Sequence, residues 1–177
     1  MLKRKGFTLV ELMCGLSVSA ILFFVAVPSI GLMINAQKQR STYERLFSLI
    51  YYTRLKATFE IYNTILCPSA NQTDCINDWQ QPLMVFTDIN NNKRRDTDEK
   101  IDRIEAIGNV NYLIYWRASG SSRYLRYTRN GSTSYQNGTF TLCPKVVDVK
   151  HIRKIIIYRT GRARYGRRHE IHAGDCI

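Results

Sequence analysis

The stretch that decides the fold is "GFTLVELMCGLSVSAILFFVAVPSIGLMINAQ", residues 6–37. No charged residue lies between Glu11 and Lys38, and this apolar length is sufficient to cross a bilayer as a helix. Three basic residues at positions 3–5 precede it and mark its cytoplasmic side. A secretory signal would have a shorter apolar core and a small-x-small cleavage site. The sequence therefore predicts a transmembrane or assembly helix over residues 7–34.

The helical pattern continues beyond the apolar stretch. Apolar and aromatic residues recur there at steps of three and four, which is the spacing of one helix face. We therefore expect one helix from about Thr8 to about Ile61, with an amphipathic second half over 35–62. Pro28 should kink or locally melt it. The residues that carry the periodicity are Tyr43, Leu46, Phe47, Ile50, Ala57 and Ile61.

Glu11 is out of place in this apolar stretch. A charged, unpaired carboxylate in hydrocarbon costs about 2 to 4 kcal/mol on insertion scales. If the chain is cut after Gly6, the new amine of Phe7 becomes a cation at a similar depth. The amine of a neighbouring subunit could then neutralise Glu11.

The chain after the helix changes to a strand-like pattern. Several segments of alternating polarity are separated by polar turns, and Asn130-Gly131 and Asn137-Gly138 are typical of hairpins. We expect six to eight mostly antiparallel strands within residues 63–177. The predicted fold class is α+β, with the long N-terminal helix packed on an antiparallel β-sheet domain.

Four cysteines in the polar part predict two disulfides. Cys67 and Cys75 bracket a short polar loop and are paired here, which leaves Cys143 with Cys176. Disulfides indicate an oxidising compartment, the periplasm or the cell exterior. A fifth cysteine, Cys14, lies in the apolar run and is expected to be buried. No zinc site is expected, because the spacings match no familiar ligand set.

The segment "DINNNKRRDTDE", residues 88–99, has the ligand spacing of a calcium loop. Against calcium, Lys93 replaces the turn glycine, two arginines lie inside, and no helices flank the segment. A structural turn rich in Asn and Asp fits equally well and is favoured here. The six positions with calcium-loop spacing are Asp88, Asn90, Asn92, the carbonyl of Arg94, Asp96 and Glu99.

The leader "KGFTLVE" resembles the class III signal of type IV pilins and type II secretion pseudopilins. This resemblance implies that prepilin peptidase removes residues 1–6 by cutting after Gly6 and methylates the amine of Phe7. It also implies that Glu11 guides assembly with other minor and major pilins. Pro28 lies where the family commonly has a helix-kinking proline. The implied location is the inner membrane before assembly and the pilus afterwards.

The rest of the chain resembles one branch of that family, the FimT minor pilins and the GspH pseudopilins. The matching elements are "FxDxNxN…RDxxE" in residues 86–99, "NGTFTLC" in 137–143 and "GRAR" in 161–164. The last resembles the "GRxR" DNA-binding signature of FimT-like proteins. The resemblance implies roles in natural transformation and pilus priming. The chain departs from the family pattern at Lys93, where glycine is usual.

Positive charge is concentrated in one region of the chain. The full sequence has 26 Lys and Arg against 14 Asp and Glu, a net charge of +12. Between Arg117 and Arg168 there are thirteen basic residues and a single acid, Asp148. Such a region indicates a polyanionic partner, which is nucleic acid, an anionic membrane or an acidic protein; the alternative is a solvated basic surface that only keeps the chain soluble.

The C-terminal motif suits duplex DNA. Gly161 ends a strand and allows close backbone approach. In an extended chain, Arg162 and Arg164 project from one face about 7 Å apart, similar to successive phosphates. Arginine binds phosphate in bidentate fashion, and no element resembles a base-reading helix or ribbon. We therefore predict sequence-independent binding. The candidate DNA-binding residues are Lys150, Arg153, Lys154, Gly161, Arg162, Arg164, Arg167 and Arg168.

Two other functions were weighed. The basic tail of a GspH-like pseudopilin or pilus-priming subunit would contact a partner subunit and bind no ligand. An enzyme is not expected, because "HEIH" in residues 169–172 is not a metalloprotease motif and no nucleophile–base spacing is visible. No cofactor is expected.

Overall fold

The computed structural model describes residues 8–108, 112–145 and 148–176, with the backbone alone for residues 23, 25–29, 32 and 35. The predicted cleavage residues Gly6 and Phe7 lie outside this description. The chain divides into two compact units, Met1–Arg40 and Ser41–Ile177.

Helix α1 runs over Leu9–Glu60, which confirms the predicted helix to within one residue at each end. Thr8 and Glu11 form a capping box at its start: the Thr8 N–H donates to Glu11 Oε2 at 2.9 Å, and the Glu11 N–H donates to Thr8 Oγ1 at 3.3 Å. The helix is continuous through residue 28, so of the two expectations for Pro28, a kink or local melting, the melting does not occur. Cys14 is exposed, not buried as expected.

Among the residues whose side chains are described, no helix combines the length and the apolar character that a membrane crossing needs.

The second half of α1 is amphipathic, as predicted, and carries part of the core of Ser41–Ile177. Leu46, Leu49, Ile50 and Ala57 are fully buried on one face. They pack with residues of both sheets in one cluster. Burial of each leucine or isoleucine side chain is worth about 1.5–3 kcal/mol, so this face holds the helix to the sheets.

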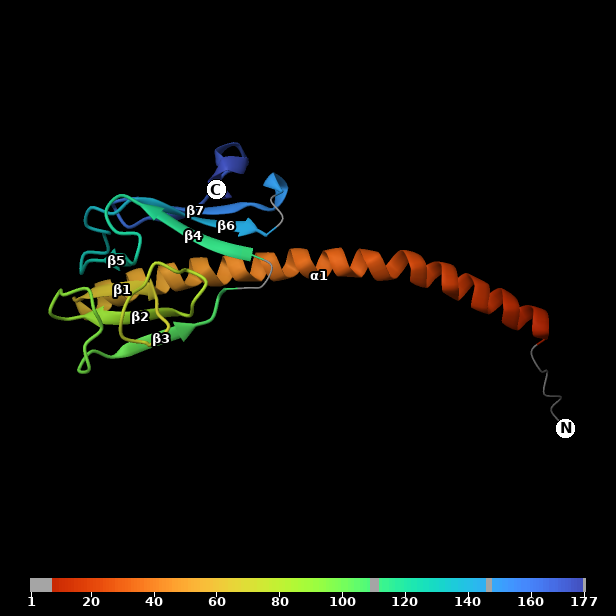
Figure 1. Ribbon diagram of the computed structural model, residues 1–177, viewed down its shortest axis with the longest axis horizontal. Coiled ribbons are helices and arrows are strands. Elements are labelled where there is room, and N and C mark those ends of the chain that lie inside the picture. Colours follow the sequence, from red (N-terminus) through yellow and green to blue (C-terminus); the bar gives the residue numbers. More distant parts are fainter. Residues whose placement is uncertain (1–7, 109–111, 146–147, 177) are drawn as a thin grey trace. The chain divides into compact units, whose positions relative to one another are not determined.

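Two four-stranded antiparallel sheets lie along that half of the helix (Figure 1). The first has the order β3-β2-β1-β5 and the second the order β4-β6-β7-β8. The α+β prediction is confirmed, with two sheets in place of the single sheet expected. The strands are β1 Asn63–Pro68, β2 Leu83–Asp88, β3 Ile101–Glu105, β4 Tyr112–Ala118, β5 Leu125–Tyr127, β6 Gly138–Pro144, β7 Arg153–Ile157 and β8 Ala163–Tyr165. Three short 3-10 helices are η1 Val149–His151, η2 Arg168–Glu170 and η3 Ala173–Cys176.

Only one of the two Asn-Gly pairs makes a turn. The Gly131 N–H donates to the Thr128 carbonyl at 2.7 Å, which closes a turn at Asn130-Gly131. The hairpin predicted there does not form, because the flanking strands β5 and β6 belong to different sheets. The hairpin turn predicted at Asn137-Gly138 is wrong, because Gly138 begins β6 and pairs with Ala118 of β4. A Cβ at Gly138 would lie 2.5 Å from the Arg117 carbonyl oxygen, so close strand packing requires glycine there.

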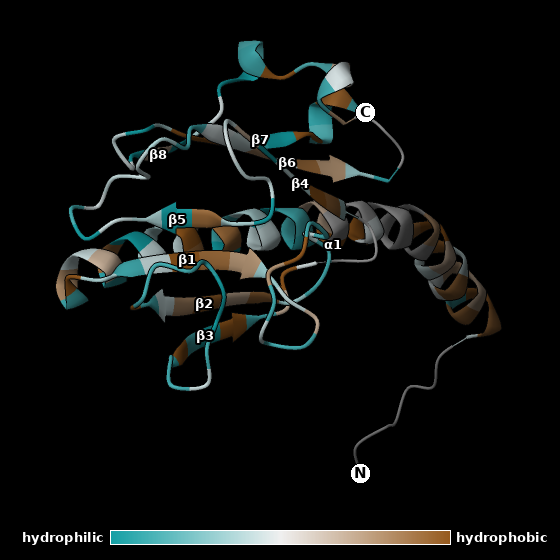
Figure 2. Ribbon diagram, turned by 60° about the vertical axis from the view of Figure 1, so that its left-hand side comes forward, coloured by the Kyte–Doolittle hydropathy of each residue, from teal (hydrophilic) through white to brown (hydrophobic). Residues whose placement is uncertain are grey.

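Both predicted disulfides form. Cys67 and Cys75 are joined with a Cα–Cα distance of 5.5 Å, and Cys143 and Cys176 with one of 5.7 Å. The second bridge ties the end of the chain to β6, and Figure 2 shows the C-terminal segment on the side of β6 and β7 away from α1.

Candidate nucleic-acid interface

Strands β7 and β8 form a hairpin whose turn contains the predicted glycine. The Gly161 N–H donates to the Tyr158 carbonyl at 2.8 Å, and the Tyr158 N–H donates to the Arg162 carbonyl at 3.0 Å. Gly161 has φ +78°, a backbone conformation that favours glycine. Gly161 therefore lies in the turn that follows the strand, which itself ends at Ile157. Its close backbone contact, however, is internal: a Cβ there would lie 1.8 Å from the Gly131 carbonyl oxygen.

Arg54 of α1 holds this turn against the neighbouring one. Its Nε donates to the Gly131 carbonyl at 2.9 Å, and one terminal nitrogen approaches the Thr160 carbonyl at 3.4 Å. The hairpin tip is therefore fixed by the helix and by the Gly131 turn. This role is not predictable from sequence, because a basic residue in an amphipathic helix is ordinarily solvated.

The two sides of β8 have different environments. Ala163 and Tyr165 face the core, and the Tyr165 ring lies 4.8 Å from that of Tyr43 and 4.3 Å from that of Phe47. Arg164 lies between them in an extended strand and projects to the opposite side. Arg162 precedes the first residue of β8, so the predicted placement of both arginines on one face of the strand stays a prediction.

Arg164 is engaged by Glu170 of η2. Its two terminal nitrogens donate to the two carboxylate oxygens at 2.8 and 2.6 Å, and its Nε donates to the Tyr158 hydroxyl at 2.8 Å. The guanidinium beside Glu170, with the N–H of Arg167, lowers the pKa of that carboxyl from 4.5 to about 2. The same contacts raise the pKa of Arg164. This bidentate pair fixes the terminal segment to β8.

Lys154 and Arg153 are also engaged within the protein. The Lys154 ammonium lies 2.6 Å from a carboxylate oxygen of Asp175 and donates to the Glu170 carbonyl at 2.7 Å, and its side chain is 12% exposed. One terminal nitrogen of Arg153 donates to the carbonyls of Lys150 and Ile152 at 2.7 and 2.9 Å. Asp175 therefore neutralises Lys154, whereas Arg153 keeps its charge and has one terminal nitrogen occupied by backbone carbonyls.

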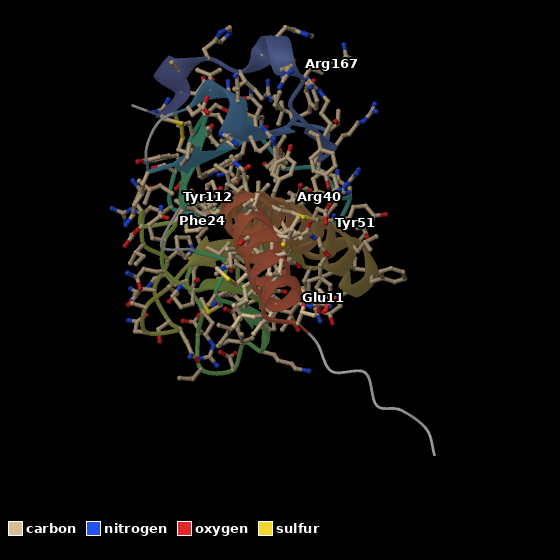
Figure 3. All side chains as sticks on the ribbon, turned by 90° about the vertical axis from the view of Figure 1, so that its right-hand side faces the viewer. Glu11, Phe24, Arg40, Tyr51, Tyr112 and Arg167 are labelled. Carbon is tan, nitrogen blue, oxygen red and sulfur yellow. A yellow bond between two sulfur atoms is a disulfide. The ribbon has the colours of Figure 1, made fainter. Side chains whose placement is uncertain are left out.

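Four other predicted residues are exposed. Arg162 follows the hairpin turn, Arg167 and Arg168 lie at the start of η2, and Lys150 lies in η1. Figure 3 labels Arg167 among them. Within the described part of the chain, the guanidiniums of Arg162 and Arg168 have no hydrogen bond or ion pair. We call Lys150, Arg162, Arg167 and Arg168 the exposed cation set.

The Cys143–Cys176 bridge explains why the inner cations are neutralised. In the β6–β7 register Thr141 is opposite Lys154, and Cys143 lies two residues further along the same face of β6. A bridge from Cys143 to Cys176 therefore brings Asp175 over Lys154. The register and the bridge together were needed to find this pair, and the sequence alone supplied only the bridge.

Family models match the N-terminal segment and most of the β-sheet domain. The model described as "Type II transport protein GspH" matches residues 42–161, and the model described as "Prokaryotic N-terminal methylation motif" matches residues 1–27. The first covers more than half of the chain.

The chain belongs to the GspH family. Pilin-like proteins of this family are structural subunits, so the prediction that the chain is not an enzyme is confirmed. The family implies other pilins and prepilin peptidase as partners.

Solved structures show the same fold. Two crystal structures of the type IV minor pilin FimU of Pseudomonas aeruginosa match with TM-scores of 0.58 and 0.55, at 15% and 16% identity. They cover 77% and 75% of this chain and 93% and 96% of the FimU chains. The type IV pilin fold predicted for the GspH-family chain is thereby confirmed. Among curated protein sequences, no relative is found.

Proposed function

We propose that this minor pilin or pseudopilin binds duplex DNA through the exposed cation set, without reading base sequence. The observation that carries the proposal is that some of the basic residues are neutralised within the protein and others are exposed. Glu170 and Asp175 neutralise the inner Arg164 and Lys154, and leave Arg162, Arg167 and Arg168 on the outside. A fixed scaffold that displays unpaired guanidiniums suits the DNA backbone, whose affinity comes from phosphate neutralisation.

Rigidity supports the same proposal. The hairpin turn is packed on Gly131 and held by Arg54, and the terminal segment is held by Glu170 and by the bridge to Cys143. Binding therefore needs little ordering of the backbone that carries the cations.

The same packing argues against base readout. The tip of the β7–β8 hairpin lies against another turn of the protein, and β7 is paired with β6 on its other edge. A hairpin so enclosed does not insert into a major groove as a free ribbon. Contacts limited to phosphates position a protein on DNA but do not discriminate sequences.

The test is a salt series of DNA binding with single variants of the full chain in a non-ionic detergent. Arg162→Ala and Arg168→Ala should each weaken binding to all duplex sequences alike, and each should reduce the slope of log K against log salt by about 0.9. Arg123→Ala is the matched control: it removes the same charge from an exposed position outside the terminal segment. Equal losses in all three variants would reduce the effect to net charge and would defeat the proposal.

A purely structural role is the second candidate, and one exposed helix face favours it. Tyr51, Leu55 and Phe59 follow one another at four-residue steps on α1 and are 53%, 38% and 81% exposed. An apolar stripe of this kind is expected to be covered by another subunit. The test is a strain that lacks the protein. Loss of pilus or secretion assembly together with unchanged DNA uptake would favour this role.

The N-terminal proposals accompany either role. We infer cleavage after Gly6, methylation of Phe7 and insertion of residues 7–34 in the inner membrane before assembly, supported by the methylation-motif match over 1–27. Glu11 is proposed to guide assembly. Its Oε2 accepts from the N–H and the hydroxyl of Thr8, so the opposite oxygen is the one available to a neighbouring subunit's amine.

A further inference from the structure

A buried carboxylate at the end of β2 lacks a partner on one oxygen. Asp88 is 0% exposed, and its Oδ2 accepts from the Lys93 N–H at 3.3 Å, but its Oδ1 has no hydrogen bond. Four buried side-chain polar atoms of the described residues lack a partner, and this oxygen is the one that belongs to a carboxylate. Burying an uncompensated charge is costly, so Asp88 requires either a proton or a cation.

The loop backbone adopts the turn of a calcium loop even though Lys93 replaces the usual glycine. Lys93 stands at the turn position where calcium loops have glycine, yet it adopts φ +65°. Asn91, two residues earlier, has φ +66°. The loop therefore makes the sharp turn of a calcium loop in spite of the lysine side chain.

The other oxygen atoms at positions of the calcium-loop spacing belong to the same loop, residues 88–99. Asn90 and Asn92 side-chain oxygens accept backbone N–H groups two residues on, at 3.0 and 2.7 Å, and both amides donate to Asp96 Oδ2 at 2.6 Å. Glu99 is 1% exposed, and its two oxygens accept from the N–H groups of Ile89 and Asp96 at 2.7 and 3.1 Å. The oxygens of Asn90, Asn92 and Glu99 each keep a second lone pair for a cation, whereas Asp96 Oδ2 accepts two hydrogen bonds and can bind an ion only when these open.

The two arginines in the loop do not fill its interior. A terminal nitrogen of Arg94 lies 2.7 Å from Asp74 Oδ1, outside the loop, and the Nε of Arg95 donates to the Glu99 backbone carbonyl at 2.9 Å. The charged group that faces Asp88 from another strand is Arg126 of β5.

We propose that residues 88–99 form a site for a divalent cation, with calcium preferred. The ligands are the side-chain oxygens of Asp88, Asn90, Asn92, Asp96 and Glu99 and the carbonyl of Arg94. An all-oxygen set that includes carboxylates, amides and a carbonyl suits calcium, which takes six to eight such ligands in flexible geometry, better than magnesium.

Calcium binding at this site involves a small rearrangement. Among the described residues, no three His, Cys, Asp or Glu side chains already form a metal-holding group. The Asn–Asp96 hydrogen bonds therefore open as the donors turn to the ion. Such coupling lowers affinity, so we expect a dissociation constant of about 0.1–1 mM, the range of extracellular calcium modules.

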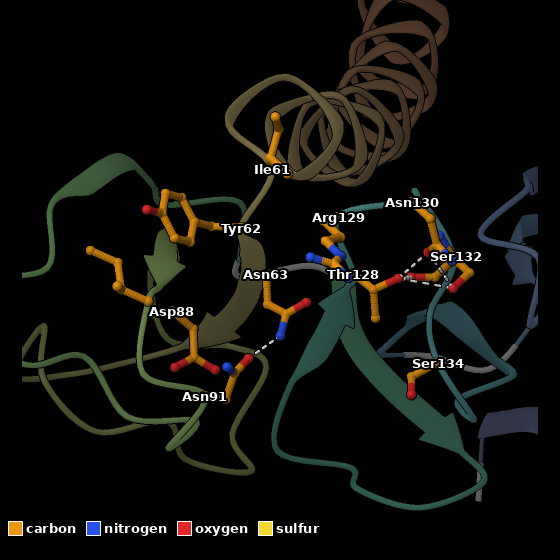
Figure 4. Close-up of a pocket in the computed structure, with 11 residues that line it drawn as sticks. Ile61, Tyr62, Asn63, Asp88, Asn91, Thr128, Arg129, Asn130, Ser132 and Ser134 are labelled. Atoms are coloured by element: carbon orange, nitrogen blue, oxygen red, sulfur yellow. Dashed lines mark hydrogen bonds between the residues drawn. The ribbon is translucent and has the colours of Figure 1, made fainter.

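The ion reaches the loop from an open cavity of about 550 Å³. Asn63, Asp88 and Asn91 line it, and Figure 4 shows the Asp88 carboxylate beside Asn91, which accepts a hydrogen bond from Asn63 of β1. Through that contact, ordering of the loop also stiffens the start of β1 in the first sheet.

The test is calorimetric titration of the full chain in a non-ionic detergent with calcium chloride, and with magnesium chloride in parallel. Calcium should bind with one-to-one stoichiometry, and about 10 mM calcium should raise Tm by several degrees. Asp88→Asn should weaken calcium binding at least tenfold while its Tm in chelator stays at or above that of the wild type, because a buried charge is removed. That last measurement separates loss of the site from loss of the fold.

Asp98→Asn is the matched control, because Asp98 is exposed in the same loop at a position outside the ligand spacing. It should bind calcium as the wild type does. The proposal is overturned by the absence of saturable binding up to about 10 mM calcium. It is equally overturned if Asp88→Asn binds normally or if Asp98→Asn loses as much affinity as Asp88→Asn. The site is independent of the exposed cation set, so either proposal can fail alone.

Discussion

The carboxylate of Glu170 accepts both terminal nitrogens of Arg164, at 2.8 and 2.6 Å. One of its oxygens also accepts the backbone N–H of Arg167 at 2.7 Å. Arg164, the second arginine of the "GRAR" element, is therefore neutralised by an ion pair within the protein. It positions the segment that carries Arg167 and Arg168, and Arg162 is the arginine of the element that remains available to phosphate.

Replacing Glu170 with glutamine should release Arg164. If Arg164 then reaches a phosphate, the slope of log K against log salt steepens by about 0.9. The measurement is a fluorescence-anisotropy salt series, with Asp98→Asn as a control for the loss of one negative charge. A slope that stays at the wild-type value would show that Arg164 is a positioning residue only.

The Arg164–Glu170 pair should withstand mild acid. The pKa of Glu170 in the folded protein is about 2, below its ordinary value of 4.5. The contribution of the pair to stability is therefore fully present above pH 4.5 and is lost as the pH falls through about 2. The NMR resonance of the Arg167 N–H, which donates to Glu170, should titrate with that midpoint. A midpoint near 4.5 would mean that the pair is not formed in solution.

The helix was predictable from sequence because an unbroken apolar run over its first half passes directly into a three- and four-residue periodicity over its second half. Strand β1 was not predicted: all but the first of its residues are buried, so it lacks the alternation that marks a half-buried strand. It nevertheless lies between β2 and β5 in the first sheet. Asn137-Gly138 was misread because glycine serves close strand packing there as readily as it serves a turn.

The candidate site was predictable in composition but not in charge state. The sequence places thirteen basic residues between Arg117 and Arg168, and the structure shows which of the predicted ones are neutralised. The partners Glu170 and Asp175 lie beyond that region in sequence and reach it through the terminal disulfide. A count along the chain cannot register such pairs, because they depend on sheet register.

Gly161→Ala should unfold the hairpin rather than change a ligand contact. The alanine would need φ +78° and would place its Cβ 1.8 Å from the Gly131 oxygen. Left-handed backbone and steric displacement together predict a loss of roughly 2–4 kcal/mol in the free energy of unfolding. Gly174→Ala is the control, since nothing lies within 4 Å of a Cβ there, and it should change stability by less than about 0.5 kcal/mol. Urea denaturation measures both, and equal stabilities would show that the hairpin tip is not packed as described.

Removing the terminal bridge should affect stability and DNA binding together. The cysteines of the Cys143–Cys176 bridge are 33 residues apart, so the double serine variant should lose about 3–4 kcal/mol through the entropy of the unfolded chain. Freed from β6, η3 no longer holds Asp175 over Lys154, and the segment with Arg167 and Arg168 becomes harder to order on DNA.

The Cys67–Cys75 bridge supplies the comparison for that variant. Its cysteines are 8 residues apart and far in sequence from the exposed cation set, so its double serine variant should lose about 2–3 kcal/mol without a change in DNA affinity. Both variants are assayed by denaturation and by anisotropy, at a temperature where each remains folded. If they weaken DNA binding equally, or if neither does, the terminal bridge does not organise the binding surface, and the exposed cations act without the scaffold proposed for them.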